Sequence, residues 1–129
     1  MIVLDAKVLI AVLDTTDAHH ERSVSLLLER SDESLSASTV TLAEVLVGAA
    51  RAGRLEDGDS ALRALGVREL PLPEGSASRL ARLRADTRLK LPDCCVLLTA
   101  ETHRAILATF DERLLAVARQ KGVPVVEPL

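Results

Sequence analysis

Four carboxylate residues stand where the sequence pattern predicts the end of a strand or the beginning of a helix. Asp5 directly follows the apolar run 2–4, and Glu44, Asp93 and Asp111 lie near the starts of three segments with helical apolar spacing. The helix dipole stabilises an acid in the first turn by about 0.3–1 kcal/mol, so a structural role would explain each of these three alone. In a parallel α/β fold, however, helix N-termini lie along the carboxyl edge of the sheet. We therefore expect all four acids at one rim.

Carboxylates gathered at one rim would need a counter-charge. Two like charges about 4 Å apart repel by several kcal/mol at an effective dielectric constant near 20. A divalent cation relieves this repulsion, and oxygen ligands without Cys or His favour Mg²⁺ or Mn²⁺ over Zn²⁺. Such an ion makes water a better nucleophile, and a neighbouring carboxylate can accept its proton. If the acids converge, metal-dependent hydrolysis of a phosphodiester is the chemistry they can do.

The elements that would position these acids alternate between strands and helices. The run 2–4 has three apolar residues without alternation, which predicts a central strand covered on both faces. Further strands are expected at 35–38, 67–72, 105–109 and 123–126, and helices at about 8–13, 18–30, 39–50, 59–66, 74–88, 92–100 and 111–122. This order predicts an α/β protein, a three-layer α/β/α fold with a central parallel sheet of about five short strands.

Two helix starts carry local signals beside the acids. Thr41-Leu-Ala-Glu44 has the spacing of a capping box, which would give Glu44 a structural role. Pro92 suits the first helical turn and is followed by Asp93, which predicts a buried helix with an acid at its positive end.

Length and composition limit the class of protein. At 129 residues, 48% of them hydrophobic, the chain fits a single domain spanning 1–129 with an aliphatic core, since Phe110 is its single aromatic residue besides histidine. No apolar run reaches the length of about 20 residues needed to cross a bilayer, and no signal segment precedes the first strand, so we expect a cytoplasmic protein without a membrane partner. The adjacent Cys94 and Cys95 indicate buried reduced thiols rather than a disulfide framework. His19 and His20 point in different directions on a helix, which disfavours metal binding.

Basic residues gather in the segment 74–90. Arg79, Arg82, Arg84 and Arg88, followed by Lys90, fall mostly on the outer side of the expected helix. Such charges usually form a solvated face, and a phosphate-binding rim for RNA is the alternative. Both interpretations stay open, because the net charge of −3 does not identify a partner.

Four sequence pieces, in this order and spacing, carry a resemblance to a known family. They are Ile-Val-Leu-Asp5-Ala-Lys-Val-Leu-Ile-Ala, Thr41-Leu-Ala-Glu44-Val-Leu-Val-Gly, Leu91-Pro-Asp93, and Ala108-Thr-Phe-Asp111-Glu-Arg-Leu. Together they resemble the PIN-domain ribonucleases of bacterial toxin–antitoxin systems, the VapC-like toxins, over nearly the whole chain.

The resemblance implies a function and a set of site residues. Asp5, Glu44, Asp93 and Asp111 would be a catalytic quartet that binds Mg²⁺ or Mn²⁺, with Asp5 and Asp93 as the direct ligands. Thr109 matches a polar position that helps to orient water or metal. The chain would cleave RNA as a homodimer, and a cognate antitoxin would block its site.

Lys7 departs from the family pattern, which commonly has Asn or Ser two residues after the first Asp. Its ammonium group would either fold back onto the carboxylates and compete with the cation, or point outward to an RNA phosphate. Lys7 also keeps an inactive PIN-fold interaction protein open as an alternative. A phosphoacceptor signalling domain is a further alternative, although such domains usually need an acid pair where this chain has Asp5 alone, and an aspartyl nucleophile would want Asp at position 7.

Overall fold

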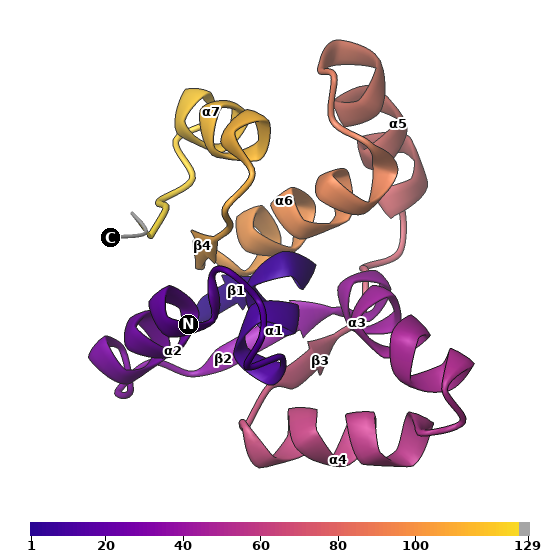
Figure 1. Cartoon of the computed structure of the whole chain (residues 1–129). Helices are drawn as coiled ribbons and strands as arrows, with labels where there is room; N and C mark the ends of the chain where they lie inside the picture. Colours follow the sequence, from indigo (N-terminus) through magenta and orange to yellow (C-terminus); the bar gives the residue numbers. More distant parts are fainter. Residues whose placement is uncertain (127–129) are drawn as a thin grey trace.

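The computed structural model describes residues 1–126, which form a parallel sheet covered by helices on both faces (Figure 1). The elements, in chain order, are β1 (Ile2–Leu4), α1 (Ala6–Leu13), α2 (His20–Glu29), β2 (Leu35–Ser38), α3 (Thr39–Arg51), α4 (Leu55–Ala64), β3 (Arg68–Leu70), α5 (Ser76–Asp86), α6 (Leu91–His103), β4 (Ile106–Ala108) and α7 (Glu112–Gln120). This confirms the predicted α/β class and the three-layer architecture.

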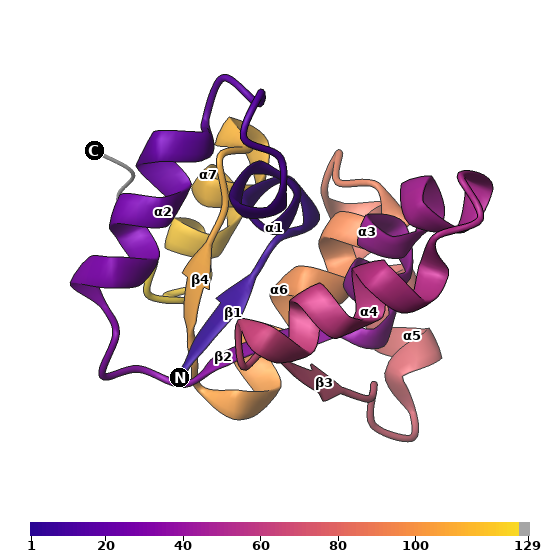
Figure 2. The ribbon, with the colours of Figure 1, turned by 60° about the horizontal axis from the view of Figure 1, so that its bottom comes forward.

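The sheet places β1 between β2 and β4, in the order β3-β2-β1-β4, with all neighbours parallel (Figure 2). Val3 pairs with Ser36 on one side and with Leu107 on the other. All three residues of β1 are buried, as the unalternated apolar run predicts. Because β1 is central and Asp5 follows it directly, this carboxylate lies at the middle of the sheet's carboxyl edge.

The expected fifth strand is reduced in the structure. Instead of a strand over 123–126, the described chain has one isolated parallel bridge between Leu107 and Val125. Pro124 precedes the bridging residue and has no N–H to donate, so a regular ladder cannot continue through it. The sheet therefore has four strands within residues 1–126.

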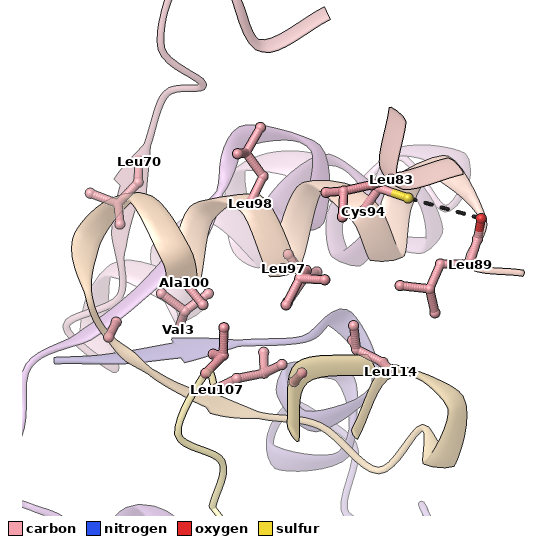
Figure 3. Close-up of a cluster of buried hydrophobic side chains, with 14 residues drawn as sticks. Val3, Leu70, Leu83, Leu89, Cys94, Leu97, Leu98, Ala100, Leu107 and Leu114 are labelled. Carbon is pink, nitrogen blue, oxygen red and sulfur yellow. Dashed lines mark hydrogen bonds between the residues drawn. The ribbon is translucent and has the colours of Figure 1, made fainter. Parts of the chain in front are cut away.

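Two apolar clusters lie on the two faces of the sheet. On one face, residues of α5, α6 and α7 pack on Val3, Leu70 and Leu107, as Figure 3 shows. On the other, residues of α1 to α4 pack on Ile2 and Leu4. Alternate residues of the same strand thus belong to different cores, which fixes the register of β1.

Helix α6 lies across the first of these faces, and Cys94–Ala100 within it is entirely buried. Both cysteines are free thiols, as predicted, and burial raises the pKa of each. The Cys94 Sγ–H points to the carbonyl of Leu89, 3.9 Å away (Figure 3). These thiols are packing residues.

The sequence predicts that four apolar residues of α5 face inward, namely Ala77, Leu80, Ala81 and Leu83. In the structure Leu83 is buried and Leu80 partly buried, but Ala77 and Ala81 are exposed. The reason is that α5 packs chiefly on α6 and stands away from the sheet (Figure 1). A helix with one helical neighbour buries only the residues that face it.

Candidate active site

Asp5 is a buried carboxylate held by two hydrogen bonds. It is the N-cap of α1, with extended backbone (φ −77°, ψ 156°), and its Oδ1 accepts the Ala6 N–H at 2.8 Å. Its Oδ2 accepts the hydroxyl of Thr109 at 2.6 Å, across 104 residues of chain. The side chain is only 7% exposed, so its position is defined by β1, α1 and the end of β4 together.

Burial raises the pKa of Asp5 above its ordinary value of 3.8. The hydrogen bonds from Thr109 and Ala6 oppose this by stabilising the charged form, the neighbouring charge of Asp111 raises the pKa further, and that of Lys7 lowers it. An acid with a raised pKa at this edge of the sheet is a candidate for function rather than for a stabilising ion pair.

Thr109 connects two of the acids. Its Oγ1 donates to Asp5 and accepts the backbone N–H of Asp111 at 3.0 Å. Asp111 is itself the N-cap of α7, because its Oδ1 accepts the Leu114 N–H at 2.9 Å. One buried hydroxyl, 2% exposed, thus fixes Asp5 relative to the start of α7.

Glu44 on α3 and Asp93 on α6 approach the same edge. Burial raises the pKa of Asp93, and the charges of Asp5 and Asp111 raise it further. The pKa of Glu44 is raised by burial and then by Asp5 and Asp93, although its side chain is more exposed. The charges of Asp5, Asp93 and Asp111 thus act on one another, and Glu44 feels those of Asp5 and Asp93.

The predicted capping box at Thr41 and Glu44 is wrong. Helix α3 begins at Thr39, and its N-cap is Ser38, whose Oγ accepts the Thr41 N–H at 3.1 Å. Ser38 ends β2, so the strand passes into the helix without an intervening loop. Glu44 takes no part in the cap, and its carboxylate is available to the site.

Three of the four acids, Glu44, Asp93 and Asp111, line a cavity of about 560 Å³, whereas Asp5 does not line it. The wall combines the starts of α1, α6 and α7 with one residue of α3 and the segment just before α6. The lining residues are Lys7, Glu44, Arg88, Leu89, Lys90, Pro92, Asp93, Asp111, Glu112 and Arg113. We call this space the acidic cavity, and its volume is typical of a ligand site.

The carboxylate oxygens at this edge of the sheet are of the type that binds a hard cation. Carboxylate oxygens are the ligands that Mg²⁺ and Mn²⁺ prefer, and the mutual repulsion of Asp5, Glu44 and Asp93 is what a cation would relieve. Within residues 1–126, however, no three Asp, Glu, His or Cys side chains are already close enough to form a metal site. Mg²⁺ usually keeps several waters and needs only one or two carboxylates, so a site for it does not require three acids already in place.

The predicted basic residues divide among different places. Arg88 and Lys90 line the acidic cavity, whereas Arg79 and Arg82 line a separate space of about 220 Å³ beside Asp86 and Glu101. Arg84 is exposed and lines neither of these spaces. The structure thus brings only part of this arginine set to the acids.

Lys7 is exposed in the wall of the acidic cavity. It forms no ion pair within 4.0 Å with the described residues, so its ammonium group is not folded onto a carboxylate. Its charge still lowers the pKa of Asp5, although less than the hydrogen bonds from Thr109 and Ala6 do.

The histidines lie outside this site. The ring of His19 stacks on Phe110 with centroids 4.6 Å apart, and the guanidinium carbon of Arg22 lies 5.4 Å from the same ring. His20 Nδ1 is 2.7 Å from the carbonyl of Ala11. These contacts anchor the start of α2 to α1 and to Phe110, between β4 and α7.

Sequence reasoning missed two residues of the site. Arg113, the second residue of α7, lines the acidic cavity, and Ser38 sets the start of the helix that carries Glu44. A serine at the end of a predicted strand, directly before a helical pattern, was an available N-cap signal. Arg113 carried no signal beyond its place two residues after Asp111.

Within residues 1–126, no helix is long and apolar enough to cross a membrane. No curated protein sequence matches the chain at a significant level. The model of one family, the PIN domain, matches residues 2–120.

Solved structures of similar fold include components of toxin–antitoxin systems. One is a toxin–antitoxin complex from Klebsiella pneumoniae, with a TM-score of 0.77 and 28% identity, covering 100% of this chain and 98% of that one. FitAcB from Neisseria gonorrhoeae has a TM-score of 0.74 and 25% identity, covering 99% and 98%. VapC20 from Mycobacterium tuberculosis, described as a sarcin-ricin loop cleaving toxin, has a TM-score of 0.74 at 14% identity, covering 91% and 95%, and shows the fold alone.

Proposed function

We propose that this chain, which belongs to the PIN-domain family, is a metal-dependent endoribonuclease and the toxin of a toxin–antitoxin pair. The observation that carries this proposal is the electrostatic coupling of four acids from four separate elements, three of which line one cavity. Asp5, Glu44 and Asp93 each have a raised pKa, and each is affected by the others or by Asp111. A fold gains nothing in stability from such crowding, which is typical of a catalytic site.

Asp5 and Asp93 are the residues that would hold Mg²⁺ or Mn²⁺. When bound, the ion lowers the pKa of water and stabilises the charge that develops on phosphodiester oxygens. Asp5 is suited to this role because Thr109 and the Ala6 N–H hold its two oxygens in fixed directions. Asp93 is suited to it because it is half-buried in the first turn of α6, at the cavity wall.

Hydrolysis needs an acceptor for the proton of the attacking water. Glu44 is the most exposed of the quartet, and its raised pKa moves its carboxylate toward the range in which it accepts a proton effectively. Water adds to phosphorus, its proton passes to a Glu44 carboxylate oxygen, and the bond from phosphorus to the leaving ribose oxygen breaks. The leaving oxygen then takes this proton from Glu44, directly or through solvent water, which restores the Glu44 carboxylate.

Asp111 has a supporting role in this mechanism. One of its oxygens accepts the Leu114 N–H, so it is committed to the start of α7. Its charge nevertheless raises the pKa of Asp5 and of Asp93. It therefore adds negative potential for a cation while it fixes the wall that carries Arg113.

RNA, a cognate antitoxin and a second copy of the chain are the proposed partners, and the cytoplasm is the proposed location. The K. pneumoniae structure, similar over the whole chain, is described as a toxin–antitoxin complex, which supports an antitoxin for this chain. An antitoxin Arg or Lys near the acids would substitute for the cation, because a guanidinium or ammonium group pairs with carboxylates. The outer arginines Arg79, Arg82 and Arg84 remain a proposed surface for RNA.

Incubation of the purified chain with a mixed pool of RNA tests this proposal. We expect cleavage with Mg²⁺ or Mn²⁺ and none with excess chelator. Equal cleavage in both conditions would reject metal dependence, and intact RNA in both would reject the nuclease.

An interaction protein that has kept the fold without the activity is the second candidate. Two observations favour it. Within residues 1–126, no three acids are already arranged around a metal position, and Lys7 lies in the cavity wall. Calorimetric titration with Mn²⁺ separates the two candidates. A nuclease binds the ion through Asp5 and Asp93 and loses it in Asp93→Asn, whereas an inactive relative shows no binding in either form.

A further inference from the structure

We propose that Arg88 and Arg113 form a phosphate-binding pair in the wall of the acidic cavity and hold the RNA backbone there. This inference rests on the proposed nuclease function and deepens it by naming the groups that bind the substrate. Arg88 comes from the segment between α5 and α6, and Arg113 from the first turn of α7. Both side chains are exposed, and both line the same cavity as Asp93 and Asp111.

Basic residues occupy unfavourable positions around this cavity. Lys7 is the second residue of α1, Lys90 is the N-cap of α6, and Arg113 is the second residue of α7. A positive charge at a helix N-terminus opposes the dipole by about 0.3–1 kcal/mol. The dipole explains the acids at these three helix starts, but it does not explain the bases.

Two of the bases act as counter-charges to the acids. Lys7 lowers the pKa of Asp5, and Lys90 lowers that of Asp93. Arg88 and Arg113 line the same wall with exposed side chains.

Ion pairing does not account for these two arginines either. Neither guanidinium group forms an ion pair within 4.0 Å with residues 1–126. Both guanidinium groups in the cavity wall are therefore free of ion pairs with the described residues and open to a ligand in the cavity.

The chemistry of these groups identifies the ligand as a polyanion. A guanidinium group matches a phosphate with two parallel hydrogen bonds. With a net charge of −3 and four acids at the site, the chain needs local positive charge to attract RNA. The cavity wall supplies it beside the acids, where the phosphates adjoining the scissile bond would lie.

Binding of fluorescently labelled single-stranded RNA tests the pair without cleavage. The full chain and the variants Arg88→Gln, Arg113→Gln and the double variant are titrated in chelator over a series of NaCl concentrations. The control is Arg51→Gln, an exposed arginine in the last turn of α3, which is about 10 Å along the helix from Glu44. Each cavity variant should flatten the slope of log affinity against log salt by about 0.7 and the double variant by about 1.4, with no change in the control.

Folding is checked in the same variants. Arg113→Gln removes a positive charge from a helix start, so its thermal midpoint should equal or exceed that of the parent. Arg113→Lys keeps the charge without the planar fork, and it should restore the salt slope while its affinity stays several-fold below the parent. These two readouts separate loss of a phosphate contact from loss of structure.

The outcomes distinguish this inference from the proposed function. If the parent cleaves RNA with Mg²⁺ and the double variant keeps the parental salt slope, the nuclease stands and the phosphate-binding pair is wrong. If the double variant binds RNA normally but loses affinity for an acidic peptide, the pair recognises a protein and the inference is also wrong. If the parent neither binds nor cleaves RNA, both proposals fail.

Discussion

The hydroxyl of Thr109 donates a 2.6 Å hydrogen bond to Oδ2 of Asp5, joining the end of β4 to the end of β1. The same oxygen accepts the backbone N–H of Asp111, so one buried group orients a carboxylate and the start of a helix. Because Asp5 is buried, the hydrogen bond also stabilises its charged form.

Replacing Thr109 by Val should therefore lower both stability and activity. A hydrogen bond to a charged group contributes about 1.5–3 kcal/mol, against about 0.5–1.5 kcal/mol for a neutral one. Thr99→Val is the matched control, since Thr99 is equally buried but donates to the neutral carbonyl of Cys95 at 2.7 Å. Urea unfolding should show the larger loss for Thr109→Val, and its loss should shrink at acid pH as Asp5 becomes protonated. Equal losses at all pH values would contradict the role assigned to this bond.

Asp5→Asn should leave the fold intact and change how its stability depends on pH. The folded pKa of Asp5 lies above the unfolded value of 3.8, so the folded state binds this proton more tightly. The charged carboxylate thus destabilises the fold once pH exceeds the folded pKa, and this penalty is absent below 3.8. Asn can keep the N-cap of α1. In chelator, the variant should match or exceed the parent in free energy of unfolding at neutral pH, with the difference vanishing in acid. A parent that gained stability over the variant as pH rose would show the opposite sign.

Ser36 and Ser38 offer a test of the helix start that positions Glu44. Both are fully buried in β2, but Ser38 Oγ caps α3, whereas Ser36 Oγ has no hydrogen-bond partner among the described residues. Ser38→Ala should lower the free energy of unfolding by about 0.5–2 kcal/mol. Ser36→Ala removes an unsatisfied hydroxyl, so it should be neutral or stabilising. Chemical denaturation of the two variants would refute the assignment of the cap if Ser36→Ala lost more than Ser38→Ala.

Lys7→Asn separates two roles for a cavity-wall lysine. The charge of Lys7 lowers the pKa of Asp5, although its ammonium group forms no ion pair within 4.0 Å with residues 1–126. If that charge competes with a cation, calorimetry should show tighter Mn²⁺ binding in the variant. If Lys7 instead contacts RNA, Mn²⁺ binding should barely move and the salt slope of RNA binding should flatten by about 0.7. We expect the first result, because the charge of Lys7 already acts on Asp5.

Much of this arrangement follows from local sequence signals. The apolar run before Asp5 predicted a central strand, and the spacing of strands and helices predicted the three layers. Pro124 explains why the fifth strand stops at one bridge. The sequence alone does not show which strand would pair with this segment, so it does not predict how far the pairing extends. The Thr41–Glu44 spacing predicts a capping box, but α3 begins two residues earlier, at Thr39, and is capped by the serine that ends β2.

The basic residues of the site were harder to predict from the sequence than its acidic residues. Asp5, Glu44, Asp93 and Asp111 lie at element boundaries, and parallel topology collects such boundaries at one edge of the sheet. No comparable rule places exposed arginines at a site, since most of them form a solvated face. Only the positions of α5, α6 and α7 show that Arg88 and Arg113 line one cavity while Arg79 and Arg82 line another.

Cleavage of RNA by an acid-to-amide variant tests the central claim most directly. Asp93→Asn keeps the size of a side chain in the first turn of α6 but removes a charge coupled to Asp5 and Glu44. Asp32→Asn, at an exposed position in the turn before β2, is the control for the same chemical change. With Mn²⁺, the parent and Asp32→Asn should cleave a mixed RNA pool, and Asp93→Asn should lose this activity although its thermal midpoint stays equal or higher. Undiminished cleavage by Asp93→Asn, or by the parent in excess chelator, would contradict the account.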